Sequence, residues 1–195
     1  FALNKISLSM DTQEGASGLG TGSMALGVDK LVMDDRKKGE TISLDGLRLS
    51  TNTQEAGGNL NSTMTFQFRG MESGGTKQGA AQINLQLRKL DVATLVKFQK
   101  DVRELRKQKM PPEQVNMMLL GKTMELLGQL AKKLPELEIT KLNFKAMDGE
   151  VTGRAKFVLD GSQLDVSGNP MLMLKALSGE GEISLPDSIV RLLAE

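Results

Sequence analysis

The chain of 195 residues is long enough to bury a substantial core, as one domain or as two similar units. Its 25 basic and 24 acidic residues leave a net charge of +1, which provides no global field for nucleic acid. The sequence contains no His and no Cys, which excludes the commonest general base, thiolate nucleophiles, zinc–thiolate sites and disulfides. We therefore expect a protein that is not an enzyme and that uses no metal, no cofactor and no nucleic acid.

The first part of the chain, residues 1–90, is predicted to be rich in β-strands. Apolar and polar side chains alternate with a period of two in Ile6–Met10, Met24–Val28, Met64–Phe68 and Ile83–Leu87. Clusters of Gly, Asn, Asp and Lys between these runs fit turns. The pattern is typical of an antiparallel sheet with one apolar and one solvated face.

Residues 91–134 change to helical periodicity and are predicted to form a pair of helices. Asp91 is placed to cap the first helix, and Pro111 and Pro112 end it and begin the second, because proline is tolerated in a first helical turn. Gly121 and Gly128 lie seven residues apart in the second helix, where they would allow close packing. We expect this helical pair to pack over one face of the sheet.

Strands return in residues 135–195, the third part of the chain. Leu137–Phe144 and Val151–Leu159 flank a turn at Asp148–Gly149, which is a hairpin pattern. A short helix is expected from Asn169 to Leu177, a short strand from Glu182 to Leu185, and a terminal amphipathic helix after Pro186.

An internal repeat is indicated by two of these segments. Ile42–Leu49 and Leu137–Phe144 share their apolar spacing, each with a break in alternation that suggests a bulge, and a returning strand follows each. The alternative is that any two amphipathic hairpins look alike. The predicted fold class is α+β: a curved antiparallel sheet of repeated hairpins, a helical pair packed on it and a short C-terminal helix, within a single domain or fragment spanning 1–195.

One segment carries a family resemblance. Leu134–Gly161 contains Leu-Pro-Glu-Leu-Glu-Ile-Thr-Lys-Leu-Asn-Phe, then Asp148–Glu150, and ends with Leu159–Gly161. This run, with the Leu-rich helical pair before it, resembles the YdgA/YihF family of uncharacterised Gram-negative proteins, which is distantly AsmA-like. The resemblance implies a periplasmic body with a short inner-membrane anchor, and it supplies no catalytic motif.

The anchor implied by the resemblance is expected to lie outside this sequence. The chain opens without Met and directly in a strand pattern, as an excised part of a longer protein would. No run approaches the roughly 18 apolar residues that span a bilayer. We expect the full-length protein to be periplasmic and anchored to the inner membrane.

Two functions from different classes fit these features. The first is a non-catalytic envelope protein that binds a lipid or another apolar ligand, or assists envelope assembly, with Phe66, Phe68, Phe144 and Phe157 lining an apolar groove. The second is a structural or protein-interaction domain that forms a homodimer or pairs with an envelope protein through a sheet edge. A cavity beneath the helices would favour the first function, and a closed core with a free edge would favour the second.

Charged clusters offer weaker alternatives. The first helix has a basic face that could contact anionic lipid or an acidic partner, or could be a solvated surface; it comprises Lys97, Lys100, Arg103, Arg106, Lys107 and Lys109. Three local acidic pairs leave a hydrolase as a remote third possibility: Asp34 with Asp35, Asp148 with Glu150, and Glu180 with Glu182.

Overall fold

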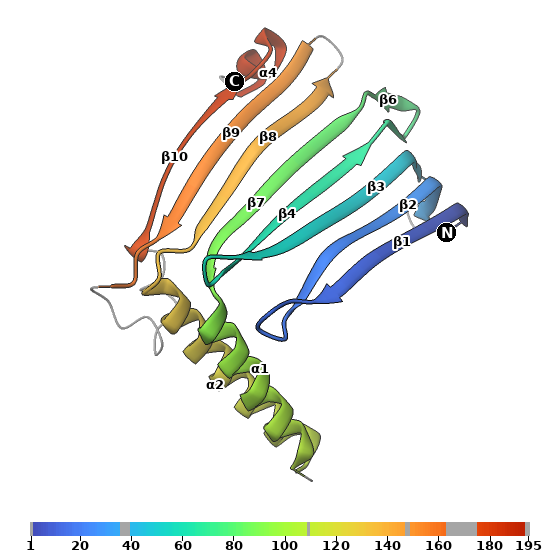
Figure 1. Cartoon of the computed structure of the whole chain (residues 1–195). Helices are drawn as coiled ribbons and strands as arrows, with labels where there is room; N and C mark the ends of the chain where they lie inside the picture. Colours follow the sequence, from blue (N-terminus) through green and yellow to red (C-terminus); the bar gives the residue numbers. More distant parts are fainter. Residues whose placement is uncertain (1, 36–39, 109, 147–148, 163–174, 194–195) are drawn as a thin grey trace.

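The computed structural model describes residues 2–35, 40–108, 110–146, 149–162 and 175–193. The described residues form one antiparallel sheet with the path β1-β2-β3-β4-β7-β8-β9-β10, and β5 and β6 extend it beside β3 (Figure 1). The strands are β1 (Ala2–Glu14), β2 (Gly20–Asp35), β3 (Glu40–Ala56), β4 (Asn59–Phe68), β5 (Gly70–Ser73), β6 (Thr76–Gln78), β7 (Ala81–Asp91), β8 (Glu136–Ala146), β9 (Gly149–Leu159) and β10 (Leu177–Ser184). The helices are α1 (Val92–Lys107), α2 (Pro112–Ala131) and α4 (Asp187–Leu193).

The alternating runs become strands whose registers align their apolar residues across the sheet. Leu8 lies opposite Leu26, Leu26 opposite Leu49, and Leu49 opposite Phe66. Because directly opposite residues share a face, these apolar side chains occupy one side of the sheet, and the residues that alternate with them, such as Ser7, Arg48 and Gln67, occupy the other. The prediction of an antiparallel sheet with one apolar face is confirmed.

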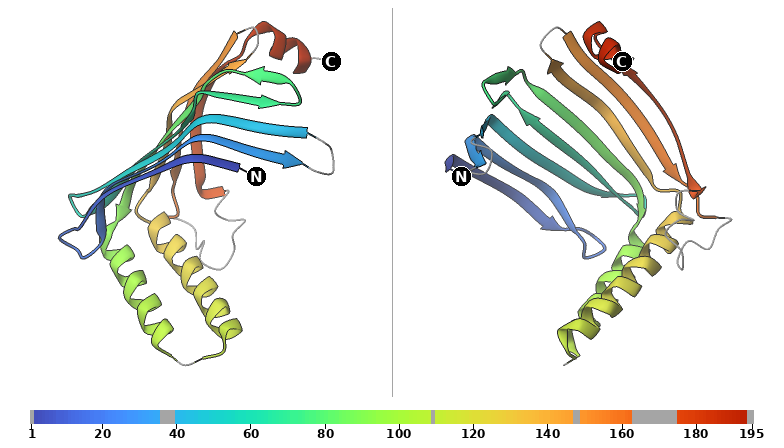
Figure 2. Two further views of the ribbon diagram at one scale, coloured as in Figure 1. Left: turned by 90° about the vertical axis from the view of Figure 1, so that its right-hand side faces the viewer. Right: turned by 180° about the vertical axis from the view of Figure 1, so that it is seen from behind.

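Bulges bend the strands, so the sheet is curved and strongly twisted (Figure 2). Register shifts occur between Ile139 and Leu142 of β8 and between Leu60 and Ser62 of β4. Lys5 and Gly46 have positive φ angles of 47° and 63°. The side chain of Arg69 lies across Gly46, where a Cβ atom would come within 2.1 Å of its Nε atom. Gly46 therefore allows both the backbone turn and the close approach of Arg69.

The helical pair forms at the predicted residues. Asp91 caps α1 by accepting a hydrogen bond from the Thr94 backbone N–H at 2.9 Å, and Pro112 opens α2. Of the two glycines in α2, Gly128 is buried, whereas Gly121 is exposed and faces open space. The close-packing role is therefore wrong for Gly121 and stays a prediction for the buried Gly128.

The prediction that the helical pair packs over a face of the sheet is wrong. Figures 1 and 2 show α1 and α2 leaving one end of the sheet as a projecting hairpin. The reason is the junction at Asp91, which is both the last residue of β7 and the N-cap of α1. With no loop between strand and helix, the chain has no room to fold back over the sheet.

The C-terminal part agrees with the sequence only in outline. β8 and β9 form the expected hairpin, although Asp148 of its turn lies outside the described residues. Residues 169–174 of the expected helix also lie outside them, whereas Lys175 and Ala176 are helical and Leu177, its predicted last residue, begins β10. The hairpins β3–β4 and β8–β9 both exist; that they are copies of one repeated unit stays a prediction.

The fully buried apolar side chains cluster mainly where helix ends and strand ends meet. Val92, Leu130, Ala131 and Ala176 lie there, and two backbone hydrogen bonds tie the chain together: Gly161 N–H to the Ala131 carbonyl at 3.0 Å and Asp160 N–H to the Ala176 carbonyl at 2.8 Å. This region, which we call the junction, packs as a core. Most of the sheet lies outside it.

Candidate functional site

The most prominent candidate site is the apolar face of the sheet. Neighbouring strands align their apolar side chains in three successive rows, and no helix of the described chain covers them (Figure 2). The first row comprises Leu8, Leu26, Leu49, Phe66, Ile83 and Leu142. The second comprises Met10, Met24, Met64, Leu85 and Ile139, with Thr51 of β3 between Met24 and Met64. The third is apolar only on β7 to β9, where it comprises Leu87, Leu137 and Phe157. The face is therefore mostly apolar across the strands from β1 to β9, and Thr51, Thr53 and Ser62 are polar positions within it.

Many apolar side chains on this face are exposed to solvent. At the β1 edge, Ile6, Leu8 and Met10 are 58%, 65% and 60% exposed. In the interior of the sheet, Phe66 and Leu137 are still 37% and 41% exposed. Since water is in contact with so many Leu, Met and Phe side chains, the face is energetically suited to bind an apolar partner.

The four predicted groove residues share this face but divide into two groups. Phe66 and Phe68 make an edge-to-face ring contact with centroids 6.4 Å apart, and Phe144 and Phe68 both pair with Ala81 of β7. Phe157 lies opposite Leu137, nearer the junction. Their role in ligand binding stays a prediction. The described helices do not lie over the sheet, so they enclose no cavity against it of the kind that would favour lipid binding.

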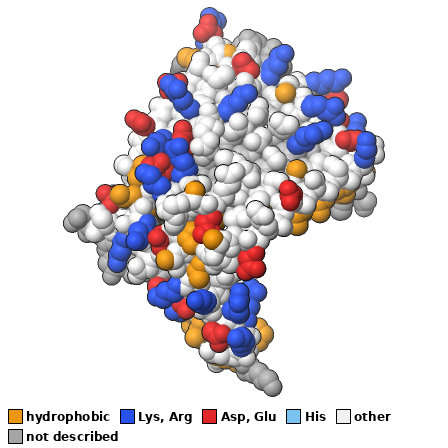
Figure 3. Space-filling view, viewed as in Figure 1, with side chains coloured by type: hydrophobic (Ala, Val, Ile, Leu, Met, Phe, Trp, Pro, Cys, Tyr) orange, Lys and Arg blue, Asp and Glu red, His pale blue; other side chains and the backbone are white. Residues whose placement is uncertain are grey.

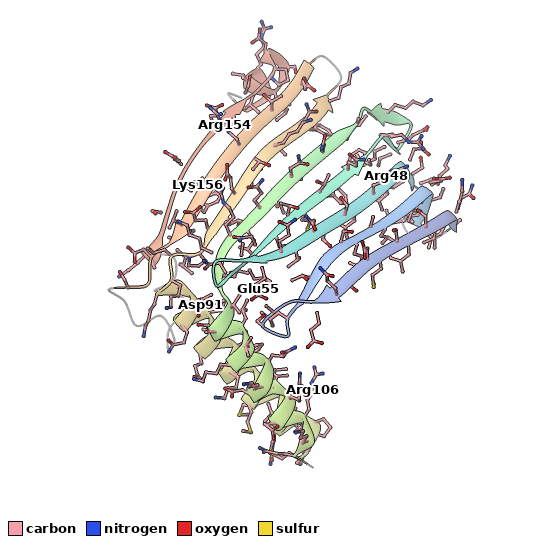
Figure 4. The ribbon with its side chains drawn as sticks, in the orientation of Figure 1. Arg48, Glu55, Asp91, Arg106, Arg154 and Lys156 are labelled. Atoms are coloured by element: carbon pink, nitrogen blue, oxygen red, sulfur yellow. The ribbon has the colours of Figure 1, made fainter. Side chains whose placement is uncertain are left out.

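The opposite face of the sheet is polar. Figure 3 views it and shows Lys, Arg, Asp and Glu side chains scattered over the strands. A shallow groove of about 340 Å³ crosses it, with Arg48, Arg69, Lys141 and Asp29 on its walls. The Lys141 Nζ atom donates a hydrogen bond to Gln82 Oε1 at 3.0 Å, and Asp29 pairs with Lys5 at 3.6 Å. Figure 4 labels Arg48 on this side.

The densest group of charges on the polar side surrounds Glu136, a buried carboxylate at the start of β8. Lys89 Nζ donates to Glu136 Oε1 at 2.6 Å, and Arg88 Nη2 and Lys156 Nζ lie 3.4 and 3.5 Å from Glu136 Oε2. The hydrogen bond from Lys89, helped by the charges of Lys156 and Arg88, lowers the pKa of Glu136 below its ordinary value. Arg88 also pairs with Glu138.

This Glu136 cluster links three adjacent strands, β7, β8 and β9, next to the junction. Its three cations outnumber its two carboxylates by one charge, and the ion pairs between strands hold the strand ends in place, which is a structural role. Sequence reasoning missed the cluster. The signal was the basic pair Arg88–Lys89 at the end of one strand pattern together with Glu136 and Glu138 at the start of another.

The acidic pairs weighed for hydrolysis are not assembled into a site by the described residues. Glu182 of β10 pairs with Arg154 Nε at 2.8 Å, and both side chains are mostly exposed. The side chains of Asp34 and Asp35 and the whole of Asp148 lie outside the description. Among the residues that the structure describes, no three Asp or Glu side chains are grouped to hold a metal ion.

The basic face of α1 is partly neutralised by ion pairs. Lys97 Nζ lies 3.2 Å from Glu125 of α2, and Lys107 Nζ lies 2.7 Å from Glu104. Lys122 of α2 bridges Asp101 and Glu125, which raises the pKa of Lys122 and lowers that of Glu125. The pairs of Lys97 with Glu125 and of Lys122 with Asp101 join α1 to α2 on one side, whereas Arg106 lies near the far end of the projecting hairpin (Figure 4).

No helix in the described part of the chain is long and apolar enough to cross a membrane.

Comparison with known proteins places the chain among bacterial proteins without assigning a task. A family model described as "Bacterial protein of unknown function (DUF945)" matches residues 1–195. No curated protein matches the sequence. No solved structure matches it either.

Proposed function

The chain belongs to the DUF945 family of bacterial proteins of unknown function, and from that premise we propose that it is a non-catalytic protein whose apolar sheet face binds the acyl chains of a lipid. The observation that carries this proposal is the continuous row of exposed or half-buried apolar side chains from Leu8 to Phe66, which no described helix covers.

The size and chemistry of the face favour an aliphatic ligand. Soluble monomers rarely expose apolar patches larger than a few hundred Å² without a partner for them. Interior strands have their backbone N–H and C=O groups paired with neighbouring strands, so a ligand on the face meets side chains alone. Leu, Met and Ile supply aliphatic contacts without directional requirements, and Met adapts its shape to varied partners. An acyl chain satisfies this surface without hydrogen-bonding groups of its own.

The cell envelope is the setting that we propose for this activity. The resemblance to the YdgA/YihF family supports a periplasmic body anchored to the inner membrane, where such a face could hold a lipid or assist envelope assembly. Absence of Cys is compatible with an oxidising compartment, where unpaired thiols are disfavoured.

The first test is native mass spectrometry of the protein isolated from a Gram-negative periplasm without detergent, followed by organic extraction and lipid analysis. We expect a lipid to co-purify at near-stoichiometric amounts. A preparation that is free of lipid and does not take up a fluorescent fatty acid in titration would refute the proposal.

Matched variants identify the face that binds. Phe66 and Gln67 are neighbours on β4 with side chains on opposite faces of the sheet. Phe66→Ala should weaken fatty-acid binding roughly tenfold, since burying a Phe side chain contributes about 1.5–3 kcal/mol. Gln67→Ala should leave binding unchanged. Equal losses in the two variants would contradict binding on the apolar face.

A second candidate function is association through a strand edge, favoured by the exposure of β1. All 13 of its residues are exposed, and β2 is its one strand neighbour among the described residues. An edge of this kind is a template for strand addition.

A further inference from the structure

The two edge strands of the sheet differ in how they are protected against pairing. β10 has eight residues, carries Gly179, Glu180, Gly181 and Glu182 in succession, and is followed by helix α4. β1 has 13 residues, no proline and no glycine, and its central stretch Ile6–Met10 carries no charge. Charges, short length and bulges are the usual ways in which edges avoid pairing. By these criteria β10 is protected, whereas the middle of β1 is open.

The sequence of β1 is self-complementary when read against itself in the antiparallel direction. With Leu8 at the centre, Ser7 falls opposite Ser9 and Ile6 falls opposite Met10 of a second copy. One position further out, Lys5 falls opposite Asp11, the charges that flank the uncharged stretch. In this register, apolar side chains lie opposite apolar side chains, hydroxyl groups lie opposite hydroxyl groups, and a cation lies opposite an anion.

We infer that β1 pairs with β1 of a second copy of this chain in an antiparallel dimer whose two-fold axis passes between the two Leu8 residues. The inference rests on the second function proposed above, association through a strand edge, and identifies the edge, the partner and the register. A two-fold axis perpendicular to the sheet uses the same edge of both copies, as in an isologous dimer interface.

Neighbouring registers are less favourable for the same side chains. Centring the pair on Ser9 places Ile6 opposite Thr12 and Ser7 opposite Asp11, and centring it on Ser7 leaves Asp11 opposite Leu3. Both lose the match between Lys5 and Asp11. Pairing of β10 with itself would place Glu180 and Glu182 close to their own copies, where like charges repel.

Dimerisation in this register extends the apolar face across both copies. Residues directly opposite in an antiparallel pair share a face, so Ile6, Leu8 and Met10 of both chains meet on the apolar side. Lys5 and Asp11 meet at the two ends of the stretch, beside the ion pair of Lys5 with Asp29. The two sheets become one, with an apolar surface that runs from one β9 to the other.

Disulfide cross-linking tests the register, because the chain has no Cys of its own. Leu8→Cys places two thiols at the two-fold axis, where opposite Cβ atoms are about 4.5–5.5 Å apart. Mild oxidation should give a covalent dimer of Leu8→Cys. The matched control Ile183→Cys, at a position of similar exposure on β10, should stay uncrosslinked.

A charge exchange tests the same contact without cross-linking. Leu8→Lys and Leu8→Glu each bring like charges together at the axis and should raise the dimer dissociation constant at least roughly tenfold. Mixing the two variants should restore the dimer as a heterodimer. Ile183→Lys should dimerise as the natural chain does. Sedimentation velocity over a concentration series measures all four, and circular dichroism checks that each variant is folded.

The outcomes separate this inference from the functions proposed above. A natural chain that stays monomeric overturns the β1 dimer and leaves edge pairing with a different protein as the remaining form of edge association. A dimer that cross-links through Ile183→Cys and not through Leu8→Cys overturns the register and retains edge association. If Leu8→Lys dimerises with the same dissociation constant as the natural chain, the register is also overturned. Lipid binding is measured separately, so its failure leaves the dimer result intact.

Discussion

The junction and the open sheet are two regions of one chain that are stabilised by different kinds of interaction. At the junction, Val92, Leu130, Ala131 and Ala176 are buried together, and the buried carboxylate of Glu136 joins three strands nearby. Across the sheet, by contrast, Leu8, Met10 and Ile183 are mostly exposed. Side-chain packing stabilises the first region, whereas backbone hydrogen bonds and cross-strand pairs stabilise the second.

The difference shows where mutation should be costly. A residue enclosed on all sides cannot change size without moving its neighbours, but an exposed strand residue can change freely. Substitutions on the apolar face should therefore be tolerated better than substitutions at the junction. Four substitutions test this contrast, from the largest expected effect to the smallest.

Gly161→Ala should reduce the free energy of unfolding by about 3 kcal/mol, through overpacking of the junction. A Cβ atom on Gly161 would lie 2.5 Å from the Ala131 Cβ atom and 3.2 Å from its carbonyl carbon, and Ala131 is completely buried. Urea denaturation followed by circular dichroism measures the change. Gly20→Ala is the control, since a Cβ atom there meets nothing within 4 Å. Equal stability of the two variants would show that the junction is not tightly packed.

Glu136→Gln should cost about 2 kcal/mol near neutral pH, because it removes the charge that Lys89, Arg88 and Lys156 surround. The pKa of Glu136 is lowered in the folded state. Its stabilising contribution is therefore complete above the ordinary pKa of 4.5 and is lost as the pH falls through the lower folded-state pKa.

Denaturation of Glu136→Gln and the natural chain as a function of pH checks this prediction. The difference in unfolding free energy should shrink at acidic pH. Glu182→Gln, which breaks the exposed pair with Arg154, is the control and should cost less than about 1 kcal/mol. A constant difference at all pH values would mean that the charge of Glu136 is not what stabilises the cluster.

Asp91→Ala should cost about 1 kcal/mol, the usual contribution of an N-cap side chain. Asp91 accepts hydrogen bonds from the Thr94 N–H at 2.9 Å and the Thr94 hydroxyl at 2.6 Å, and these bonds lower its pKa. Asp91→Asn retains a capping oxygen and should keep most of the stability. Thermal unfolding of both variants measures the difference, and an Asn variant as unstable as the Ala variant would argue that charge, not capping, is responsible.

Ile183→Ser should change the unfolding free energy by no more than about 0.5 kcal/mol, although it removes a large apolar side chain. Ile183 is 61% exposed on the edge strand β10, opposite Gly153. Chemical denaturation detects the change. A loss as large as that of Gly161→Ala would remove the contrast between the open sheet and the junction.

Local patterns predicted most of the elements correctly because their signals lie within a few residues. The alternation in Ile6–Met10 and Met64–Phe68 predicted strands, and Asp91 and Pro112 predicted the starts of the two helices. The shared face of Phe66, Phe68, Phe144 and Phe157 also followed from alternation once the register was known. The Glu136 cluster could not be predicted in this way, because Lys89 and Glu136 are separated in sequence by the whole helical hairpin.

The sequence by itself determined the class of fold, the two-sided character of the sheet and the absence of His and Cys chemistry, because these depend on composition and local periodicity. Tertiary structure alone decided what covers the apolar face. An apolar stripe specifies that a surface needs a partner but not which element supplies it. Here Asp91 joins β7 to α1 without a loop, so the helices project away and no helix of the described residues covers the face.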